Sequence, residues 1–200
     1  MSQPIDFYFE FASPYGYFAS ERIDAIGARH GREVRWHPIM LGAVFKQTGA
    51  RPLMHTPLKG AYMTHDLPRF ARYLGVPLTM PAQMPVNSLA PSRAFYWLDD
   101  QRPGLAKALA TALYRAHWGE GRDIGEVAEV VQIAVPLGID GDALRAALAD
   151  PAIKQKLKDA TQAALDRGVF GSPFIFVDDQ AFWGADRLDQ VDAWLARGGW

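Results

Sequence analysis

The spacing of apolar and polar positions at the start of the chain predicts a strand followed by a helix. Residues 5–11 (IDFYFEF) alternate and are rich in aromatic side chains, which is typical of a strand. Ser13 and Pro14 follow, a favourable N-cap residue and a residue suited to the first helical position. Apolar residues at near-helical spacing predict a helix up to Gly31, and residues 34–39 predict a second strand. This β-α-β unit implies parallel strands with a right-handed connection.

The middle of the chain predicts a block of helices. Residues 40–57 form a mostly irregular stretch with one short helix at 41–48. Long irregular stretches of this kind tend to be functional. From residue 58 to residue 167 the apolar periodicity predicts four to six helices, of which the clearest are 105–118, 124–137, 142–148 and 152–167.

The end of the chain predicts a hairpin and a final helix. Residues 174–177 (FIFV) predict a buried strand, 178–180 a turn, 181–183 a second strand, and 186–197 an amphipathic helix. The predicted order is therefore β-α-β, helical insertion, β-β-α. The length of 200 residues allows one domain or one domain with a large insertion.

Charge and composition narrow the possible partners. The net charge is −1 with both signs interspersed, so we expect no nucleic-acid partner and no membrane surface. The chain has no cysteine, which excludes dithiol chemistry carried by the protein itself. Its five histidines are scattered without metal-ligand spacing, and we predict no metal. Residues 1–6 do not have the pattern of a secretory leader, and no apolar run is long enough for a membrane helix. We therefore expect a cytoplasmic protein.

Ser13 is the first candidate for chemistry, because it lies where a strand turns into a helix. A helix N-terminus offers free N–H groups and the positive end of the helix dipole, so it stabilises an anion such as a thiolate. The Ser13 hydroxyl could donate to such an anion. A role as N-cap alone also explains the local sequence.

The segment Gly171-Ser172-Pro173 is the second candidate, because it places a proline at the entry to a buried strand. A cis Ser172–Pro173 bond would leave the backbone N–H and C=O of Ser172 free to pair with an extended peptide ligand. An ordinary trans proline that opens an edge strand is the alternative.

At this point the chain resembles a known family. Its S-P-Y-G at the first helix, large helical insertion and G-S-P before a strand resemble the DsbA-like branch of the thioredoxin superfamily. Within that branch, D-F-Y-F-x-F-x-S-P-Y, L-G-A-V-F-K-x-T-G, K-G-x-Y-M, N-S-L and F-W-G-x-D-R-L resemble kappa-class glutathione transferases and 2-hydroxychromene-2-carboxylate isomerases. The resemblance spans almost the whole chain. It implies an α/β, thioredoxin-like fold at 1–57 and 168–200, with an inserted helical domain at 58–167.

The resemblance also implies roles for individual residues. Ser13 would hydrogen-bond the sulfur of glutathione and favour its thiolate. Ser172 and Pro173 would hold its cysteinyl part, and the γ-glutamyl end would be held by Trp183, Gly184, Ala185, Asp186 and Arg187. Asp186 is equally well explained as the N-cap of the last helix. Lys46 and Lys59 lie in or beside the irregular stretch, where a cation could meet the carboxylate of the substrate or of glutathione, although each can also be a solvated surface lysine. The resemblance places Lys46 or its neighbour, and Asn87, near the substrate.

The implied activity is a glutathione-dependent isomerisation of 2-hydroxychromene-2-carboxylate or a related intermediate of aromatic catabolism, by a homodimer. Two alternatives are a kappa-like glutathione transferase or peroxidase of broad substrate range, and a non-catalytic thioredoxin-like binding protein. One position departs from the family, because Ala50 follows Thr48-Gly49 where members often have asparagine. An amide contact to the ligand is therefore missing here.

Overall fold

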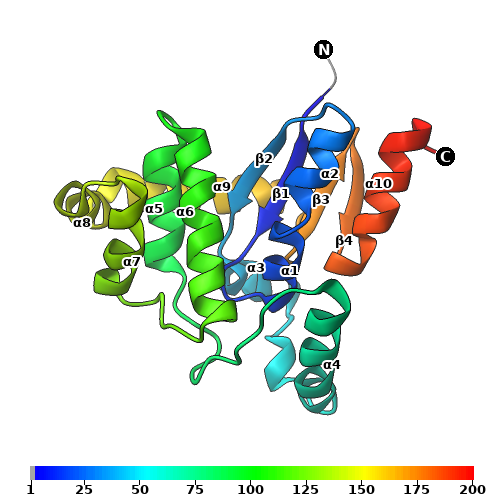
Figure 1. The fold of residues 1–200 in the computed structure, drawn as a ribbon, viewed down its shortest axis with the longest axis horizontal. Helices are drawn as coiled ribbons and strands as arrows, with labels where there is room; N and C mark the ends of the chain where they lie inside the picture. Colours follow the sequence, from blue (N-terminus) through cyan, green and yellow to red (C-terminus); the bar gives the residue numbers. More distant parts are fainter. Residues whose placement is uncertain (1–2) are drawn as a thin grey trace.

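The protein, described over residues 3–200 in a computed structural model, is built on one mixed four-stranded sheet. The strand order is β2-β1-β3-β4, and the strands are Ile5–Phe9 (β1), Val34–Pro38 (β2), Phe174–Val177 (β3) and Gln180–Trp183 (β4). β1 and β2 pair in parallel, whereas β1 with β3 and β3 with β4 pair antiparallel. This topology confirms the predicted thioredoxin-like fold (Figure 1).

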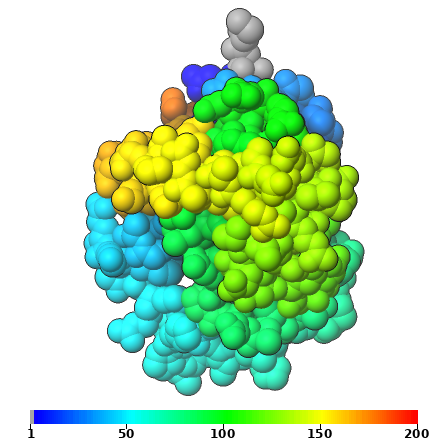
Figure 2. Space-filling model, turned by 90° about the vertical axis from the view of Figure 1, so that its left-hand side faces the viewer, coloured from blue at the N-terminus to red at the C-terminus, as the bar shows by residue number. Residues whose placement is uncertain are grey.

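Helices surround the sheet on both faces and extend to one side of it (Figure 1). They are Pro14–Ser20 (α1), Ile23–Arg29 (α2), Leu41–Thr48 (α3), Lys59–Leu74 (α4), Leu89–Asp99 (α5), Pro103–Tyr114 (α6), Val127–Ala134 (α7), Gly141–Ala149 (α8), Pro151–Asp166 (α9) and Leu188–Arg197 (α10). The six α-helices from α4 to α9 confirm the predicted helical insertion. Figure 2 shows the part around α8 and α9 as the yellow and yellow-green outer surface.

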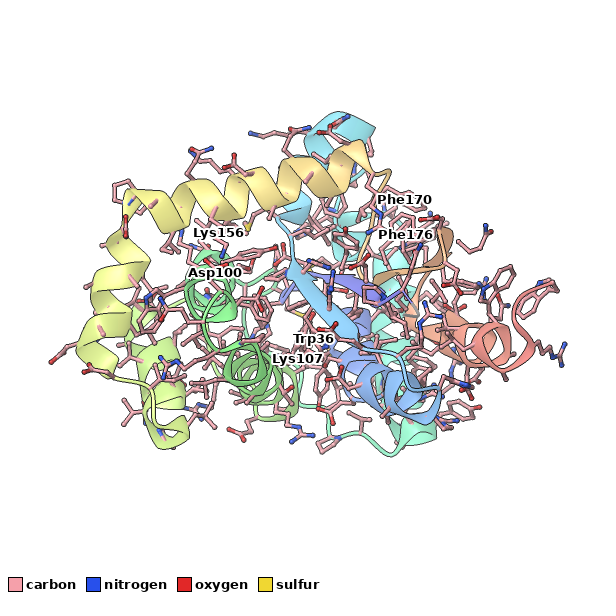
Figure 3. All side chains as sticks on the ribbon, turned by 90° about the horizontal axis from the view of Figure 1, so that it is seen from above. Trp36, Asp100, Lys107, Lys156, Phe170 and Phe176 are labelled. Atoms are coloured by element: carbon pink, nitrogen blue, oxygen red, sulfur yellow. The ribbon has the colours of Figure 1, made fainter. Side chains whose placement is uncertain are left out.

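The alternation of β1 gives each face of the sheet its own core. Phe7 and Phe9 point into the larger core, to which side chains of α1, α2, α6 and α10 also contribute. Tyr8 points the other way, into a smaller core with Val44 of α3 and Ala164 of α9. Figure 3 shows α9 lying along one face of the sheet, with α2 and α10 on the opposite side. The β1 sequence therefore fixes where both layers pack.

The first strand is shorter than predicted, ending at Phe9 rather than at residue 11. Its parallel ladder ends opposite Pro38, which has no N–H to donate. The Glu10 carbonyl instead accepts the N–H of Ser13 at 2.9 Å, which closes a turn. This turn brings the start of α1 directly to the end of β1.

Several other boundaries also differ from the prediction. The single helix expected up to Gly31 is broken between α1 and α2, where the Ser20 hydroxyl donates to the Tyr17 carbonyl at 2.7 Å. The helix expected at 124–137 is shorter, because Pro136 lies in a final 3₁₀ turn. In the hairpin, Asp178 and Asp179 both have positive φ, as a two-residue type I′ turn requires.

Asp6 in β1 is held by two side chains from distant elements, His37 and Arg167. Its carboxylate contacts His37 of β2 at 2.8 Å and Arg167, just after α9, at 2.6 Å. Burial by itself would raise the pKa of Asp6, but the hydrogen bonds and charges of His37 and Arg167 lower it below its ordinary value. Its ionised form therefore stabilises the fold.

Replacing Asp6 by asparagine is expected to lower the free energy of unfolding by about 1–2 kcal/mol near neutral pH. A lowered pKa means that this stabilisation is present above the unfolded-state pKa and is lost as the pH falls through the folded-state pKa. Urea unfolding at several pH values should show the gap to wild type closing in acid. The matched control is Asp189→Asn, since the Asp189 side chain is 73% exposed in its pair with Arg22. A loss for Asp6→Asn no larger than the control's would contradict the expectation.

The inserted helices pack directly on the sheet edge. The Tyr96 hydroxyl of α5 donates to the Pro38 carbonyl at 2.9 Å, and the rings of Phe95 and Phe9 lie 6.0 Å apart, centroid to centroid, in one shared core.

The division into two domains, 1–57 with 168–200 and 58–167, stays a prediction, and residues 1 and 2 lie outside the described part. Within residues 3–200, no helix combines the length and apolar character needed to cross a membrane.

Candidate active site

A cleft of about 1360 Å³ opens at the end of β1, where the start of α1, α3 and the β3–β4 hairpin meet. This volume exceeds that of most small-molecule sites, so it can hold a peptide and a second ligand. The cleft lining brings together ten predicted site residues, namely Ser13, Lys59, Asn87, Ser172, Pro173, Trp183, Gly184, Ala185, Asp186 and Arg187. Lys46 is not in the lining.

Ser13 is both the N-cap of α1 and a buried hydroxyl of the cleft. Its Oγ accepts the N–H of Gly16 at 3.1 Å and donates to the carbonyl of Ser172 at 2.9 Å. The side chain is almost inaccessible, with 7% of the residue exposed. The structure therefore confirms the capping geometry, and it leaves the hydroxyl proton facing the Ser172–Pro173 segment.

The Ser172–Pro173 bond is cis, and its surroundings differ in part from the expectation. The Ser172 carbonyl is already occupied by the Ser13 hydroxyl, and the Ser172 hydroxyl accepts the N–H of Glu10 at 2.9 Å. This carbonyl has a second lone pair, so a ligand N–H can pair with it beside the Ser13 hydroxyl. The hydroxyls of Ser13 and Ser172 and the carbonyl of Ser172 form one connected group beside the turn after β1.

This turn is held from behind by α6, a support that the sequence analysis missed. The Tyr114 hydroxyl donates to the Glu10 carbonyl at 2.9 Å. The indole N–H of Trp118 donates to the Phe11 carbonyl, also at 2.9 Å. Trp118 lies in a π-helical turn that continues α6, a feature often found near functional sites. Burial raises the pKa of Tyr114 well above its ordinary value, so this phenol stays neutral.

The hairpin end of the cleft is formed by Trp183 to Arg187. Trp183 is 58% exposed and lies 5.0 Å from the Phe170 ring. Asp186 is not the N-cap of α10: a 3₁₀ turn precedes the helix, the N-cap position is Arg187, and no side-chain capping bond forms there. The Asp186 carboxylate instead accepts from Arg187 at 2.9 Å on the exposed rim. It remains open to solvent, where it could also meet a ligand ammonium.

The opposite wall comes from α3 and the segment before α4. Five residues of α3 and its C-cap line the cleft, at the spacing of one helix face: Leu41, Gly42, Phe45, Thr48 and Gly49. Lys46 lies off this face, which is why it is exposed outside the cleft. Lys59 at the start of α4 lines the cleft, and so does Arg51, which the sequence analysis did not single out. Asn87 lines it too, with its side-chain oxygen accepting the N–H of Leu89 at 3.1 Å.

Tyr15 links the start of α1 to α4 across the cleft wall. Its hydroxyl donates to the Asp66 carboxylate at 3.1 Å, and that carboxylate also accepts from Tyr62 and Arg69. Burial and the neighbouring Asp66 raise the pKa of Tyr15 above its ordinary value. The S-P-Y sequence contained this tyrosine, but its partner lies 51 residues away.

Comparisons with known proteins place the chain in a family. The model of the DSBA-like thioredoxin domain matches residues 4–196. The chain belongs to the DsbA-like thioredoxin family. It is 35% identical to a 2-hydroxychromene-2-carboxylate isomerase of Sphingobium xenophagum, over 98% of this chain and 99% of the relative. A solved structure of a 2-hydroxychromene-2-carboxylate isomerase superposes with a TM-score of 0.89 at 30% identity, covering 98% of this chain and 95% of that one.

The chain is also similar, at lower identity, to kappa-class glutathione transferases. Glutathione S-transferase kappa 1 of Caenorhabditis elegans is 27% identical, over 94% of this chain and 88% of the relative. The family resemblance inferred from the motifs is therefore confirmed, and the isomerase relatives support an isomerase here. In the described part of the chain, no three histidine, aspartate or glutamate side chains gather as a metal site would require.

Proposed function

We propose that this protein is a glutathione-dependent isomerase of 2-hydroxychromene-2-carboxylate or a closely related aromatic carboxylate. The observation that carries the proposal is the Ser13 hydroxyl, which lies inside the cleft at the N-terminus of α1 and 2.9 Å from the Ser172 carbonyl. The fold is shared with isomerases of this substrate, and relatives named as glutathione transferases are also found. A homodimer in the cytoplasm belongs to the same proposal.

The donor set of the cleft fits glutathione, which carries a thiol, an ammonium and two carboxylates. Ser13 offers a hydroxyl at the positive end of α1 for the sulfur. The exposed Asp186 carboxylate suits the ammonium, and the cations Arg51 and Lys59 suit carboxylates. When bound, glutathione would supply a thiolate that adds to the conjugated ring-opened substrate, permits rotation about the former double bond, and leaves unchanged.

The Ser13 and Ser172 pair would work as one unit. When the Ser13 hydroxyl turns from the Ser172 carbonyl to an anionic sulfur, the carbonyl is released. Its lone pairs can accept an N–H from the peptide part of the same ligand, in the manner of an added strand. The N-cap bond from Gly16 needs no change, because it uses an Oγ lone pair and not the hydroxyl proton.

The experiment that tests the proposal combines a calorimetric titration with product analysis. Glutathione is titrated into the protein, and 2-hydroxychromene-2-carboxylate is then incubated with catalytic and with saturating glutathione. Isomerised product with glutathione recovered unchanged would support the isomerase. Consumption of glutathione into a conjugate would favour the transferase alternative, and absence of glutathione binding would refute glutathione dependence.

Lys59 is the better candidate of the two predicted lysines for the substrate carboxylate, since it lines the cleft and Lys46 does not. We expect Lys59→Ala to raise the KM for the carboxylate substrate about 3- to 10-fold, because a charge-assisted hydrogen bond at an exposed site is lost. Lys46→Ala is the matched control and should leave KM unchanged. Equal effects of the two substitutions in steady-state kinetics would contradict this assignment.

A further inference from the structure

Glu10 is a buried carboxyl group beside the proposed thiol site. It follows β1 directly, lines the cleft and is only 3% exposed. Its backbone belongs to the connected group described above, because its carbonyl accepts the N–H of Ser13 and its N–H donates to Ser172 Oγ, both at 2.9 Å. Glutamate is rarely buried without a partner that compensates its charge.

The Glu10 carboxyl is held by hydrogen bonds alone. Its Oε2 accepts the N–H of Leu41 at 3.0 Å, and its Oε1 accepts the N–H of Ala12 at 3.4 Å. The Ser88 hydroxyl, which lies 4.0 Å from Met40 Sδ, is close enough to this carboxyl to lower its pKa. Over residues 3–200, no lysine, arginine or histidine forms an ion pair or hydrogen bond with this carboxyl, in contrast to Asp6, which contacts His37 and Arg167.

Among the groups packed around the Glu10 carboxyl, Glu10 itself is the one that can gain or lose a proton near neutral pH. From α6 comes the neutral phenol of Tyr114, from the start of α5 the Ser88 hydroxyl, and from α3 only a backbone N–H. Burial raises the pKa of Glu10 above its ordinary value, although the hydrogen bonds from Ser88 and the backbone oppose that rise. The charged side chains of the cleft, none of which forms a hydrogen bond to Glu10, are Arg51, Lys59, Asp66, Asp186 and Arg187.

A thiolate at Ser13 would add a second negative charge to the same cleft wall, because Glu10 and Ser13 both line it and Glu10 Oε1 accepts the N–H of Ala12, the residue before Ser13. Two like charges in a poorly hydrated site oppose each other, and their titrations become coupled. The same site accommodates a single negative charge readily, because backbone donors and the end of α1 face it. The geometry therefore favours moving one proton between the two groups over ionising both.

We propose that Glu10 is the proton acceptor of this site: as the S–H bond of bound glutathione breaks, an O–H bond forms on the Glu10 carboxylate, and the net charge of the site is unchanged. This inference rests on the proposed function. Glu10 returns the proton when the thiol is re-formed, so no other acid or base is consumed. The Ser13 hydroxyl stabilises the sulfur anion, and Glu10 holds the proton that the sulfur has lost.

Proton release on glutathione binding tests this directly. Calorimetry in buffers of different ionisation enthalpy counts the protons released per site. In wild type we expect release near zero at neutral pH, rising toward one proton as the pH falls and Glu10 is already protonated in the free protein. Glu10→Gln cannot take up the proton and should release close to one across the range below the free thiol pKa of about 8.5.

Ser88→Ala provides a second variant that keeps the carboxyl. Losing the Ser88 hydroxyl raises the pKa of Glu10 further. The change from about one proton released at low pH to none at high pH should therefore occur at a higher pH than in wild type. If Glu10→Gln does not fold, the pH dependence of proton release in wild type and its shift in Ser88→Ala test whether Glu10 accepts the proton. A wild type that releases one proton at every pH, or the same count in wild type and Glu10→Gln, would overturn the role of Glu10. No glutathione binding to wild type would overturn the proposed function as well.

Discussion

Replacing Ser13 by alanine is expected to raise the thiol pKa of bound glutathione by about 1–2 pH units and to lower kcat/KM about 10- to 100-fold. The reason is the loss of a hydrogen bond to a charged sulfur, which contributes about 1.5–3 kcal/mol. The hydroxyl is almost fully buried, so water cannot easily replace it. Thiolate absorbance in the ultraviolet, followed over pH, measures the pKa, and steady-state kinetics measure the rate.

Two further variants separate this effect from the capping role of Ser13. Ser13→Gly also removes the hydroxyl, but glycine is a much better N-cap than alanine and costs only a few tenths of a kcal/mol. It should reproduce the rise in thiol pKa with a smaller loss of stability. Ser20→Ala removes another buried hydroxyl of α1, which contacts only the Tyr17 carbonyl, and should leave the thiol pKa unchanged. An unchanged thiol pKa in Ser13→Ala would rule out the proposed hydrogen bond to sulfur.

Gly16→Ala is expected to destabilise the protein by about 1–3 kcal/mol and to weaken glutathione binding, because the added methyl group has no room. A Cβ at position 16 would lie 2.5 Å from the Tyr114 hydroxyl, 2.9 Å from Ser172 Oγ and 3.3 Å from the Glu10 carbonyl. These atoms belong to the group that fixes Ser13 and Ser172. Urea unfolding and calorimetric titration with glutathione measure the two effects.

Gly104→Ala is the matched control in another helix. Nothing lies within 4 Å of a Cβ at position 104, so this substitution should be neutral or stabilise the helix by about 0.5–1 kcal/mol. Adding Tyr114→Phe to Gly16→Ala removes the closest atom and should recover part of the lost stability. Gly16→Ala behaving like Gly104→Ala would show that the turn after β1 adapts without cost.

Local sequence determined the elements that carry the site. The alternating aromatic residues of β1, the Ser13–Pro14 start of α1 and the apolar strand 174–177 are all encoded by neighbouring residues. Helix α3 was predicted with its observed bounds, and Gly49 ends it as a C-cap in the left-handed conformation. The motifs also identified the family, which the matching family model and the isomerase structure confirm.

Only the tertiary structure decided which side chains meet in the cleft. Lys46 and Lys59 look alike in the sequence, but the rotation of α3 turns Lys46 away while the start of α4 brings Lys59 in. Asp186 was separated from its alternative role as the N-cap of α10 by a 3₁₀ turn of only three residues. Such differences depend on helix phase and terminal geometry, which sequence patterns fix only to within a few residues.

The support of the site was likewise invisible from local patterns. Tyr114 and Trp118 donate to Glu10 and Phe11 across more than one hundred residues of chain, and Ser13 meets Ser172 across 159. Hydrogen bonds between distant segments form only after the helical insertion packs on the sheet, and they carry no periodic signal. The sequence by itself thus determined the fold, the family and the candidate serines, whereas tertiary packing decided the buried state of Glu10 and the lining of the cleft.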